Sequence, residues 1–112
     1  MNPISKTVAI FACLFAAAAS QADQVSFVYG NSSDTYTYRA APYETFIVEI
    51  EGDGDTDVDL YIRAPNGEIV CRSVRPRDRE RCAVTAGSRG GRYTVEVRNL
   101  GRLPNEVLVS VL

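Results

Sequence analysis

The sequence predicts an all-β protein, an antiparallel jelly-roll-like β-sandwich of about eight strands that follows a cleaved signal peptide. Three observations predict this fold. Short segments that alternate apolar and polar residues recur from residue 24 onward, turn-rich segments separate them, and no helical periodicity follows residue 22. One apolar face on each strand is what two sheets need when they pack face to face.

The first half of the predicted domain contains four segments with strand character. In Glu44–Glu51, Phe46, Val48 and Ile50 share one face, and Asp57–Arg63 alternates strictly between apolar and polar residues. Turn-forming residues lie at 30–34 and at 52–55. The four predicted strands are Gln24–Tyr29, Thr35–Ala40, Glu44–Glu51 and Asp57–Arg63.

The second half repeats the pattern. Ala64-Pro65-Asn66-Gly67 is a strong turn signal, because proline presets one turn residue and Asn-Gly tolerates positive φ. Further turns are predicted at 87–91 and 100–105. The four predicted strands are Glu68–Ser73, Arg81–Thr85, Arg92–Arg98 and Glu106–Leu112.

Residues 1–22 have the pattern of a secretory signal peptide. Lys6 precedes the apolar run Thr7–Ala19, and Ser20-Gln21-Ala22 supplies small residues for cleavage before Asp23. Cleavage after Ala19 is the alternative. A lipoprotein signal at Cys13 is disfavoured, because bulky Phe11 stands where small residues are usual. We therefore expect one β-sandwich domain over 23–112, periplasmic or secreted, with no stable membrane insertion after cleavage.

Cys71 and Cys82 remain after the signal peptide is removed. Export and an even cysteine count favour a disulfide between them, and the spacing is not that of a C-x-x-C redox pair. The loop that such a bond closes has about a dozen residues, which corresponds to roughly 3 kcal/mol of stabilisation.

Composition excludes several function classes. The chain has no histidine, so a Ser-His-Asp triad, a Cys-His pair and a histidine-ligated metal site are excluded. The formal net charge of −2 argues against a general nucleic-acid-binding surface. Paired carboxylates can hydrolyse glycosides, but a domain this small offers little room for a deep cleft. We therefore expect no enzymatic activity.

Several motifs follow one another in a familiar order. Asp57–Ile62 (DVDLYI) leads to Pro65-Asn66-Gly67, then a hairpin leads to Arg81–Thr85, and Ala86-Gly87 precedes Gly91–Val97 (GRYTVEV). Over roughly residues 34–112 this arrangement resembles the bacterial pre-peptidase C-terminal domain. The resemblance implies a jelly-roll-like sandwich of secreted proteins, commonly appended to proteases. It also implies kinship with collagenase domains that act as binding modules, some of them calcium-assisted.

Acidic residues occupy every second position from Glu49 to Asp59. One interpretation is a calcium site formed by a loop and the following strand, because calcium prefers hard oxygen ligands. The EF-hand pattern does not fit, since Val58 stands at its glycine position. The alternatives are a solvated acidic surface and pairing with the protein's own arginines. The candidate metal ligands are Asp53, Asp55, Asp57 and Asp59.

Five arginines cluster between and beside the two cysteines, with two acids among them. They predict an anion-binding loop for a polysaccharide, a lipid headgroup or an acidic protein. A solvated hairpin tip is the alternative. The candidate partner-binding residues are Arg72, Arg75, Arg77, Arg79 and Arg81.

Together these features predict a small exported, non-catalytic binding module that recognises an extracellular or periplasmic protein or polysaccharide. It needs no cofactor, and Ca²⁺ is its candidate ligand. The alternative is a structural or inhibitory partner of a secreted hydrolase, the free-standing counterpart of an enzyme-linked domain.

Overall fold

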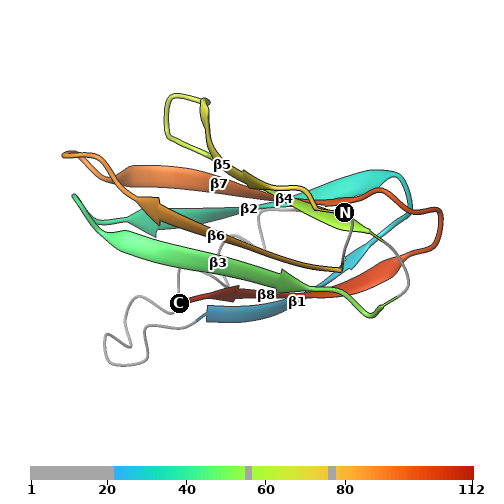
Figure 1. Cartoon of the computed structure of the whole chain (residues 1–112). Helices are drawn as coiled ribbons and strands as arrows, with labels where there is room; N and C mark the ends of the chain where they lie inside the picture. The colour runs from blue at the N-terminus through green and yellow to red at the C-terminus, as the bar shows by residue number, and fades with distance from the viewer. Residues whose placement is uncertain (1–21, 55–56, 76–77) are drawn as a thin grey trace.

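The computed structural model describes residues 22–54, 57–75 and 78–112. Within these residues the chain forms eight strands and no helix (Figure 1). The strands are β1 (Ala22–Val28), β2 (Ser32–Ala40), β3 (Thr45–Glu51), β4 (Val58–Arg63), β5 (Ile69–Ser73), β6 (Arg79–Thr85), β7 (Gly91–Asn99) and β8 (Asn105–Val111). The predicted all-β class and the predicted order of strands are confirmed.

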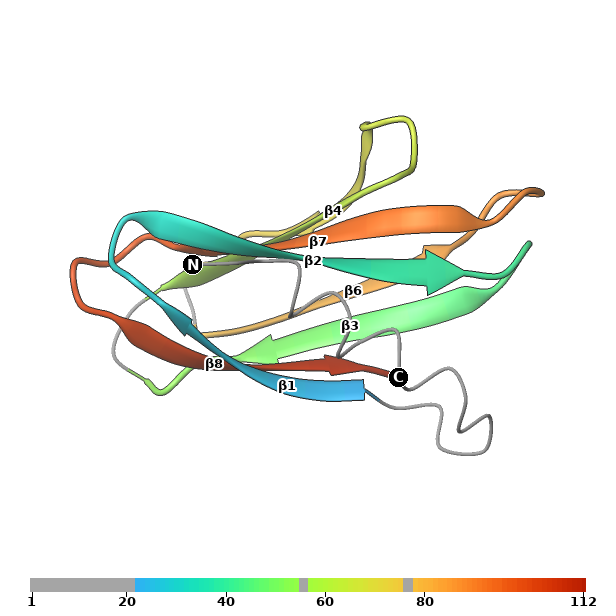
Figure 2. The same ribbon diagram turned by 180° about the vertical axis from the view of Figure 1, so that it is seen from behind.

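The strands form two four-stranded antiparallel sheets, which lie one above the other in Figures 1 and 2. Their orders are β1-β8-β3-β6 and β2-β7-β4-β5, the strand arrangement of a jelly roll. We call the first sheet A and the second sheet B. Consecutive strands mostly change sheets, so most neighbours within a sheet are distant in sequence.

The core lies between the sheets and follows the predicted alternation. From sheet A, Phe46, Val48 and Ile50 of β3 are fully buried. From sheet B, Leu60 of β4 and Val95 of β7 are equally buried. Each such side chain contributes about 1.5–3 kcal/mol on burial, so the two alternating faces are sufficient to hold the layers together.

Strand β2 begins three residues before the predicted Thr35. The reason is the compact turn before it, where Asn31 has a left-handed φ of 56° and donates its amide hydrogen to the carbonyl of Gly101. Gly30 is required in this turn, because a Cβ there would lie 2.0 Å from the carbonyl oxygen of Arg102. Ser32 and Ser33 are therefore free to pair with Asn99 and Arg98 of β7.

Strands β5 and β6 do not form the hairpin that the sequence predicts. β5 is the edge strand of sheet B and β6 is the edge strand of sheet A. The two strands are consecutive in sequence but lie in different layers of the sandwich (Figure 1). The hairpin prediction was wrong because nearness in sequence does not determine which sheet a strand joins.

Candidate functional site

A cluster of three carboxylates bridges the two sheets. Asp57 precedes β4, Asp59 lies in β4 of sheet B, and Glu80 lies in β6 of sheet A. One oxygen from each carboxylate lies within 4.8 Å of the other two. We call these three residues the acidic cluster.

The strand ends explain why these side chains meet. Strand β5 pairs with β4 from Arg63 only as far as Leu60, so Asp57 and Asp59 lie beyond the end of β5. Glu80 alternates with exposed Arg79 and Arg81 and is therefore directed into the sandwich. The acidic cluster forms where β6 faces the uncovered end of β4.

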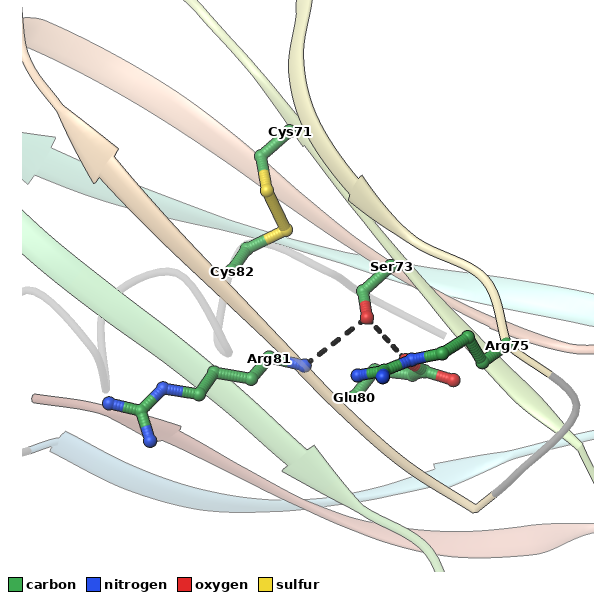
Figure 3. The surroundings of a disulfide bond; sticks show 6 residues. All are labelled: Cys71, Ser73, Arg75, Glu80, Arg81 and Cys82. Atoms are coloured by element: carbon green, nitrogen blue, oxygen red, sulfur yellow. Dashed lines mark hydrogen bonds and ion pairs between the residues drawn. A yellow bond between two sulfur atoms is a disulfide. The ribbon is translucent and has the colours of Figure 1, made fainter.

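Two contacts fix β5 and β6 beside the acidic cluster (Figure 3). Ser73, the last residue of β5, donates its hydroxyl hydrogen to the Glu80 carboxylate. Cys71, two residues before Ser73, and Cys82, two residues after Glu80, form the predicted disulfide, with their Cα atoms 6.1 Å apart. The bond therefore staples sheet A to sheet B close to Glu80.

The acidic cluster is buried and incompletely hydrogen-bonded. Asp59 is 5% exposed and Glu80 is 1% exposed. Asp57 Oδ1, Asp59 Oδ1 and Glu80 Oε2 are buried oxygens with no hydrogen-bond partner among the described residues. A buried polar atom without a partner costs free energy, so a cation or a proton bound to these three oxygens would stabilise the arrangement.

The electrostatics of Asp59 reflect this environment. Burial raises the pKa of the Asp59 carboxyl above its usual value, and the negative charges of Asp57 and Glu80 raise it further. Arg98 and the Tyr61 hydroxyl act in the opposite direction but do not cancel the increase. Arg75 forms a long ion pair with Glu80, because its Nε lies 4.0 Å from Oε1, and its side chain is 63% exposed.

The structure brings together two of the four predicted metal ligands. Asp57 and Asp59 belong to the acidic cluster, whereas Asp55 lies outside the described residues. Asp53 lies at a different place, where its carboxylate accepts the amide hydrogen of Glu106 at 3.1 Å. The metal-binding prediction for these residues stays a prediction.

Sequence reasoning missed Glu80 as a member of this site. It treated Glu80 as an acid within an arginine-rich loop. The available signal was the alternation in β6, where Glu80 shares its inward face with Cys82 and Val84. An acid at an inward-facing strand position is unusual, and it marks a buried polar site.

The other acids of the alternating run pair with arginines. Glu51 forms an ion pair with Arg79 at 3.0 Å, and Glu49 forms one with Arg81 at 2.9 Å. These pairs connect neighbouring strands β3 and β6 on the outer face of sheet A. The alternative that acids of this run pair with the protein's own arginines is therefore confirmed for Glu49 and Glu51.

The five predicted partner-binding arginines do not lie on one loop. Arg72 is on β5 in sheet B, and Arg79 and Arg81 are on β6 in sheet A. Arg75 follows β5 beside Glu80, and Arg77 lies outside the described residues. Their role in partner binding stays a prediction, although two of them are already paired with glutamates.

The tertiary structure is similar to several solved domains. The pre-peptidase C-terminal domain of collagenase from Bacillus anthracis has a TM-score of 0.69 and 12% identity, covering 82% of this chain and 89% of that domain. A periplasmic inhibitor of g-type lysozyme, PliG from Aeromonas hydrophila, has a TM-score of 0.55 and 16% identity, with coverage of 83% and 87%.

A carbohydrate-binding module of lichenase 5A from Cellvibrio mixtus, solved with cellotriose, has a TM-score of 0.50 and 7% identity, with coverage of 83% and 86%. No protein-family model matches the chain, and no curated protein matches it. The similarities define the class of domain: a small β-sandwich with the fold of the pre-peptidase C-terminal domain. The resemblance seen in the motifs is thus confirmed at the level of the fold.

A search of the described ranges for membrane spans finds no helix long and apolar enough to cross a bilayer.

Proposed function

We propose that the protein is an exported, non-catalytic interaction module whose acidic cluster binds a calcium ion. The observation that carries the proposal is the set of three unpartnered carboxylate oxygens buried where β4 meets β6. Three negative charges in a poorly solvated site repel one another, and a divalent cation relieves that repulsion while it supplies the missing partners.

The geometry suits calcium. Calcium binds oxygens at about 2.3–2.6 Å, so two oxygens on one ion are at most about 5 Å apart. The oxygens of the acidic cluster lie within 4.8 Å of one another. Three carboxylates supply between three and six ligand atoms, and water completes the coordination shell of six to eight oxygens.

A bound ion would have a structural consequence. Asp59 belongs to sheet B and Glu80 to sheet A, so one ion would connect the two layers next to the disulfide. It would stiffen the open side of the sandwich that β5 and β6 border. We propose that calcium thereby fixes the surfaces through which the module contacts its partner.

The proposed partner is an extracellular or periplasmic protein or polysaccharide. Fold similarity to domains described as a lysozyme inhibitor and as a carbohydrate-binding module supports a binding role. The disulfide supports an oxidising compartment, and the signal-peptide pattern supports export. The absence of histidine supports a non-catalytic role.

The fold similarity to PliG favours a second candidate function, inhibition of a secreted hydrolase. Incubation of the protein with a g-type lysozyme and with a secreted protease distinguishes the two roles. Stoichiometric loss of hydrolase activity would favour inhibition. Retention on a polysaccharide without any effect on either enzyme would favour the binding module.

The test of the cation site is a thermal melt of the oxidised protein in millimolar calcium and in EDTA. A ligand at about 100 times its Kd adds about 2.7 kcal/mol of stability. We therefore expect calcium to raise Tm by roughly 10 °C or more, since 1 kcal/mol shifts Tm by about 4–8 °C for a domain of this size.

Matched variants make the test specific. Glu80→Gln removes one charge from the acidic cluster with little change of shape and should abolish the calcium-dependent shift. Glu106→Gln makes the same chemical change at an exposed position of β8 and should leave the shift intact. Equal melting of the wild-type protein in calcium and in EDTA would refute the cation site.

A further inference from the structure

The outer face of sheet B carries an array of arginines that the sequence analysis did not bring together. Buried Tyr36 and Tyr38 on β2, and Tyr93 on β7, direct the alternate residues of these strands outward. β4 alternates in the same way and β5 adds one arginine opposite Tyr61. The outward arginines are Arg39, Arg63, Arg72, Arg92 and Arg98.

Strand register places two of these arginines directly opposite each other. Arg39 of β2 faces Arg92 of β7, and both are exposed. Like charges at opposing positions destabilise an antiparallel pair. Neither arginine forms an ion pair with any described residue, and the same holds for exposed Arg72. Within the described part of the chain, three positive charges on this face are therefore not neutralised.

The remaining two arginines are held in place by one acid. Glu96 accepts hydrogen bonds from Arg63 at 2.6 Å and from Arg98 at 2.8 Å. The Arg98 guanidinium also lies over the ring of Tyr61, 4.6 Å from its centre. Such contacts fix the planar guanidinium groups, which lowers the entropy lost when they bind an anion.

Hydroxyl groups lie among the arginines. Thr37 and Thr94 oppose each other in the pair next to Arg39 and Arg92, and Thr94 in turn opposes Arg63. The face therefore alternates cations with groups that both donate and accept hydrogen bonds. Its apolar content is small: Tyr61 is covered by Arg98 and is half-buried, and Ile69 of β5, which lies opposite Arg63, is exposed.

We propose that the outer face of sheet B binds an acidic polysaccharide. This proposal rests on the proposed function as a binding module and names its partner class, but it does not depend on the cation site. Carboxylates of the polymer would pair with Arg39, Arg72 and Arg92, and its hydroxyls would bond to the threonine side chains. Arg63 and Arg98 would add positive potential from fixed positions.

The pattern of side chains favours a polysaccharide over an acidic protein. Strands lie about 4.8 Å apart and outward residues repeat about every 7 Å along a strand, so the outward arginines occupy positions of a regular lattice in which Asp59 and Glu96 occupy others. A polymer with regularly spaced carboxylates matches such a lattice. The centre of a protein interface is instead enriched in aromatic and apolar anchors, whereas the described residues of this face are mainly arginines and threonines, with exposed Ile69 at its β5 edge.

The experiment measures retention of the purified protein on immobilised polygalacturonate, in EDTA and at low ionic strength of about 20 mM, where charge pairing is least screened. EDTA removes any contribution from calcium, so failure here is separate from failure of the cation site. We expect retention by polygalacturonate and not by cellulose, with release as salt is raised.

Two variants test the assigned residues. Arg39→Ser with Arg92→Ser should weaken binding by about tenfold or more, because the change removes two of the three arginines proposed to pair with carboxylates of the polymer. Arg79→Ser with Arg81→Ser makes the same change of charge on the outer face of sheet A and should alter binding by less than about twofold, since rim charges contribute little.

A third variant separates folding from binding. Arg39→Glu replaces the opposed like charges with an opposed ion pair, so it should melt at the same temperature as the wild-type protein or slightly higher. It should nevertheless bind polygalacturonate more weakly than the double serine variant does. Lower binding together with undiminished stability would support a surface shaped for an anion.

Several outcomes would overturn the proposal. Absence of wild-type retention on polygalacturonate would do so, as would full retention by Arg39→Ser with Arg92→Ser. Loss of binding only in Arg79→Ser with Arg81→Ser would assign the partner to sheet A. Tighter binding to polyglutamate, or to vesicles containing phosphatidylglycerol, would replace the polysaccharide with a protein or a lipid surface.

Discussion

Glu96 and Glu80 show how two environments act differently on the same type of side chain. Glu96 lies on the outer face of β7 between two arginines, and both of its oxygens accept hydrogen bonds from them. Glu80 lies inside the sandwich, where Ser73 satisfies one oxygen and the other has no partner among the described residues. Glu96 therefore belongs to a completed ion-pair network, whereas Glu80 belongs to the proposed cation site.

Glu96→Gln should destabilise the protein at neutral pH. Burial by itself would raise the pKa of Glu96, but hydrogen bonds from Arg63 and Arg98 outweigh burial and the pKa falls below 4.5. The side chains of Arg63 and Arg98 are 34% and 40% exposed. Solvent screening therefore limits the loss of folding free energy to about 1–2 kcal/mol. Urea unfolding at pH 7 measures the difference.

The same substitution should have a pH-dependent effect of known sign. A carboxyl whose folded pKa is lowered stabilises the fold fully above its unfolded pKa, and this contribution is lost as pH falls through the folded pKa. The stability difference between wild type and Glu96→Gln should therefore shrink as pH falls below 4.5. A difference that stays constant, or grows, as the solution is acidified would contradict this account.

At the scale of elements, the important boundary is the one between β5 and β6. Each is the edge strand of its own sheet, so no ladder of backbone hydrogen bonds joins them. Their link includes the Cys71–Cys82 bond and the contacts of the Ser73 hydroxyl with the Glu80 carboxylate and the Arg81 amide. The disulfide therefore replaces, on this side of the sandwich, the cohesion that strand pairing provides elsewhere.

Removal of the disulfide should cost about 3 kcal/mol, the chain-entropy value for a short closed loop. The two cysteines are separated by 11 positions. Cys71→Ser with Cys82→Ser should melt at a lower temperature than the oxidised protein, and the reductant-treated wild type should match the variant. Intact mass should fall by about 2 Da on oxidation of the wild type only. Identical melting of oxidised and reduced protein would argue against a stabilising bond.

The acidic cluster should respond to disulfide removal as well. If the bond positions Glu80 opposite Asp57 and Asp59, the double serine variant should bind calcium more weakly than the wild-type protein does. Isothermal titration in the absence of reductant compares the two proteins directly. Equal affinity would show that the contacts of Ser73 and the sandwich core suffice to position Glu80.

At the scale of the whole molecule, the predicted signal peptide determines where the mature domain would begin. Strand β1 begins at Ala22, and Asp23 pairs with Ser110 of β8. Cleavage before Asp23 therefore leaves almost all of β1 intact. We expect N-terminal sequencing of the exported protein to begin at Asp23, whereas cleavage after Ala19 would give Ser20. Retention of residue 1 in the exported protein would refute the signal peptide.

Much of the candidate chemistry depends on pairings between distant segments. Asp57 and Asp59 could be selected from the sequence because they stand out in an alternating acidic run. Glu80 could be recognised from the alternation in β6 only as an inward-facing acid, because its proximity to Asp57 and Asp59 depends on how β6 packs against β4. Arg39 and Arg92 are likewise far apart in sequence, and only the register of β2 with β7 makes them neighbours.

The sequence by itself determined the all-β class, the succession of strands and the inward face of most of them. These follow from period-two alternation and from turn residues, which act locally. Tertiary structure alone decided that β5 and β6 belong to opposite sheets, that Glu80 joins Asp57 and Asp59, and that arginines gather outside sheet B. The physical reason is that strand pairing and layer packing join residues without regard to their separation along the chain.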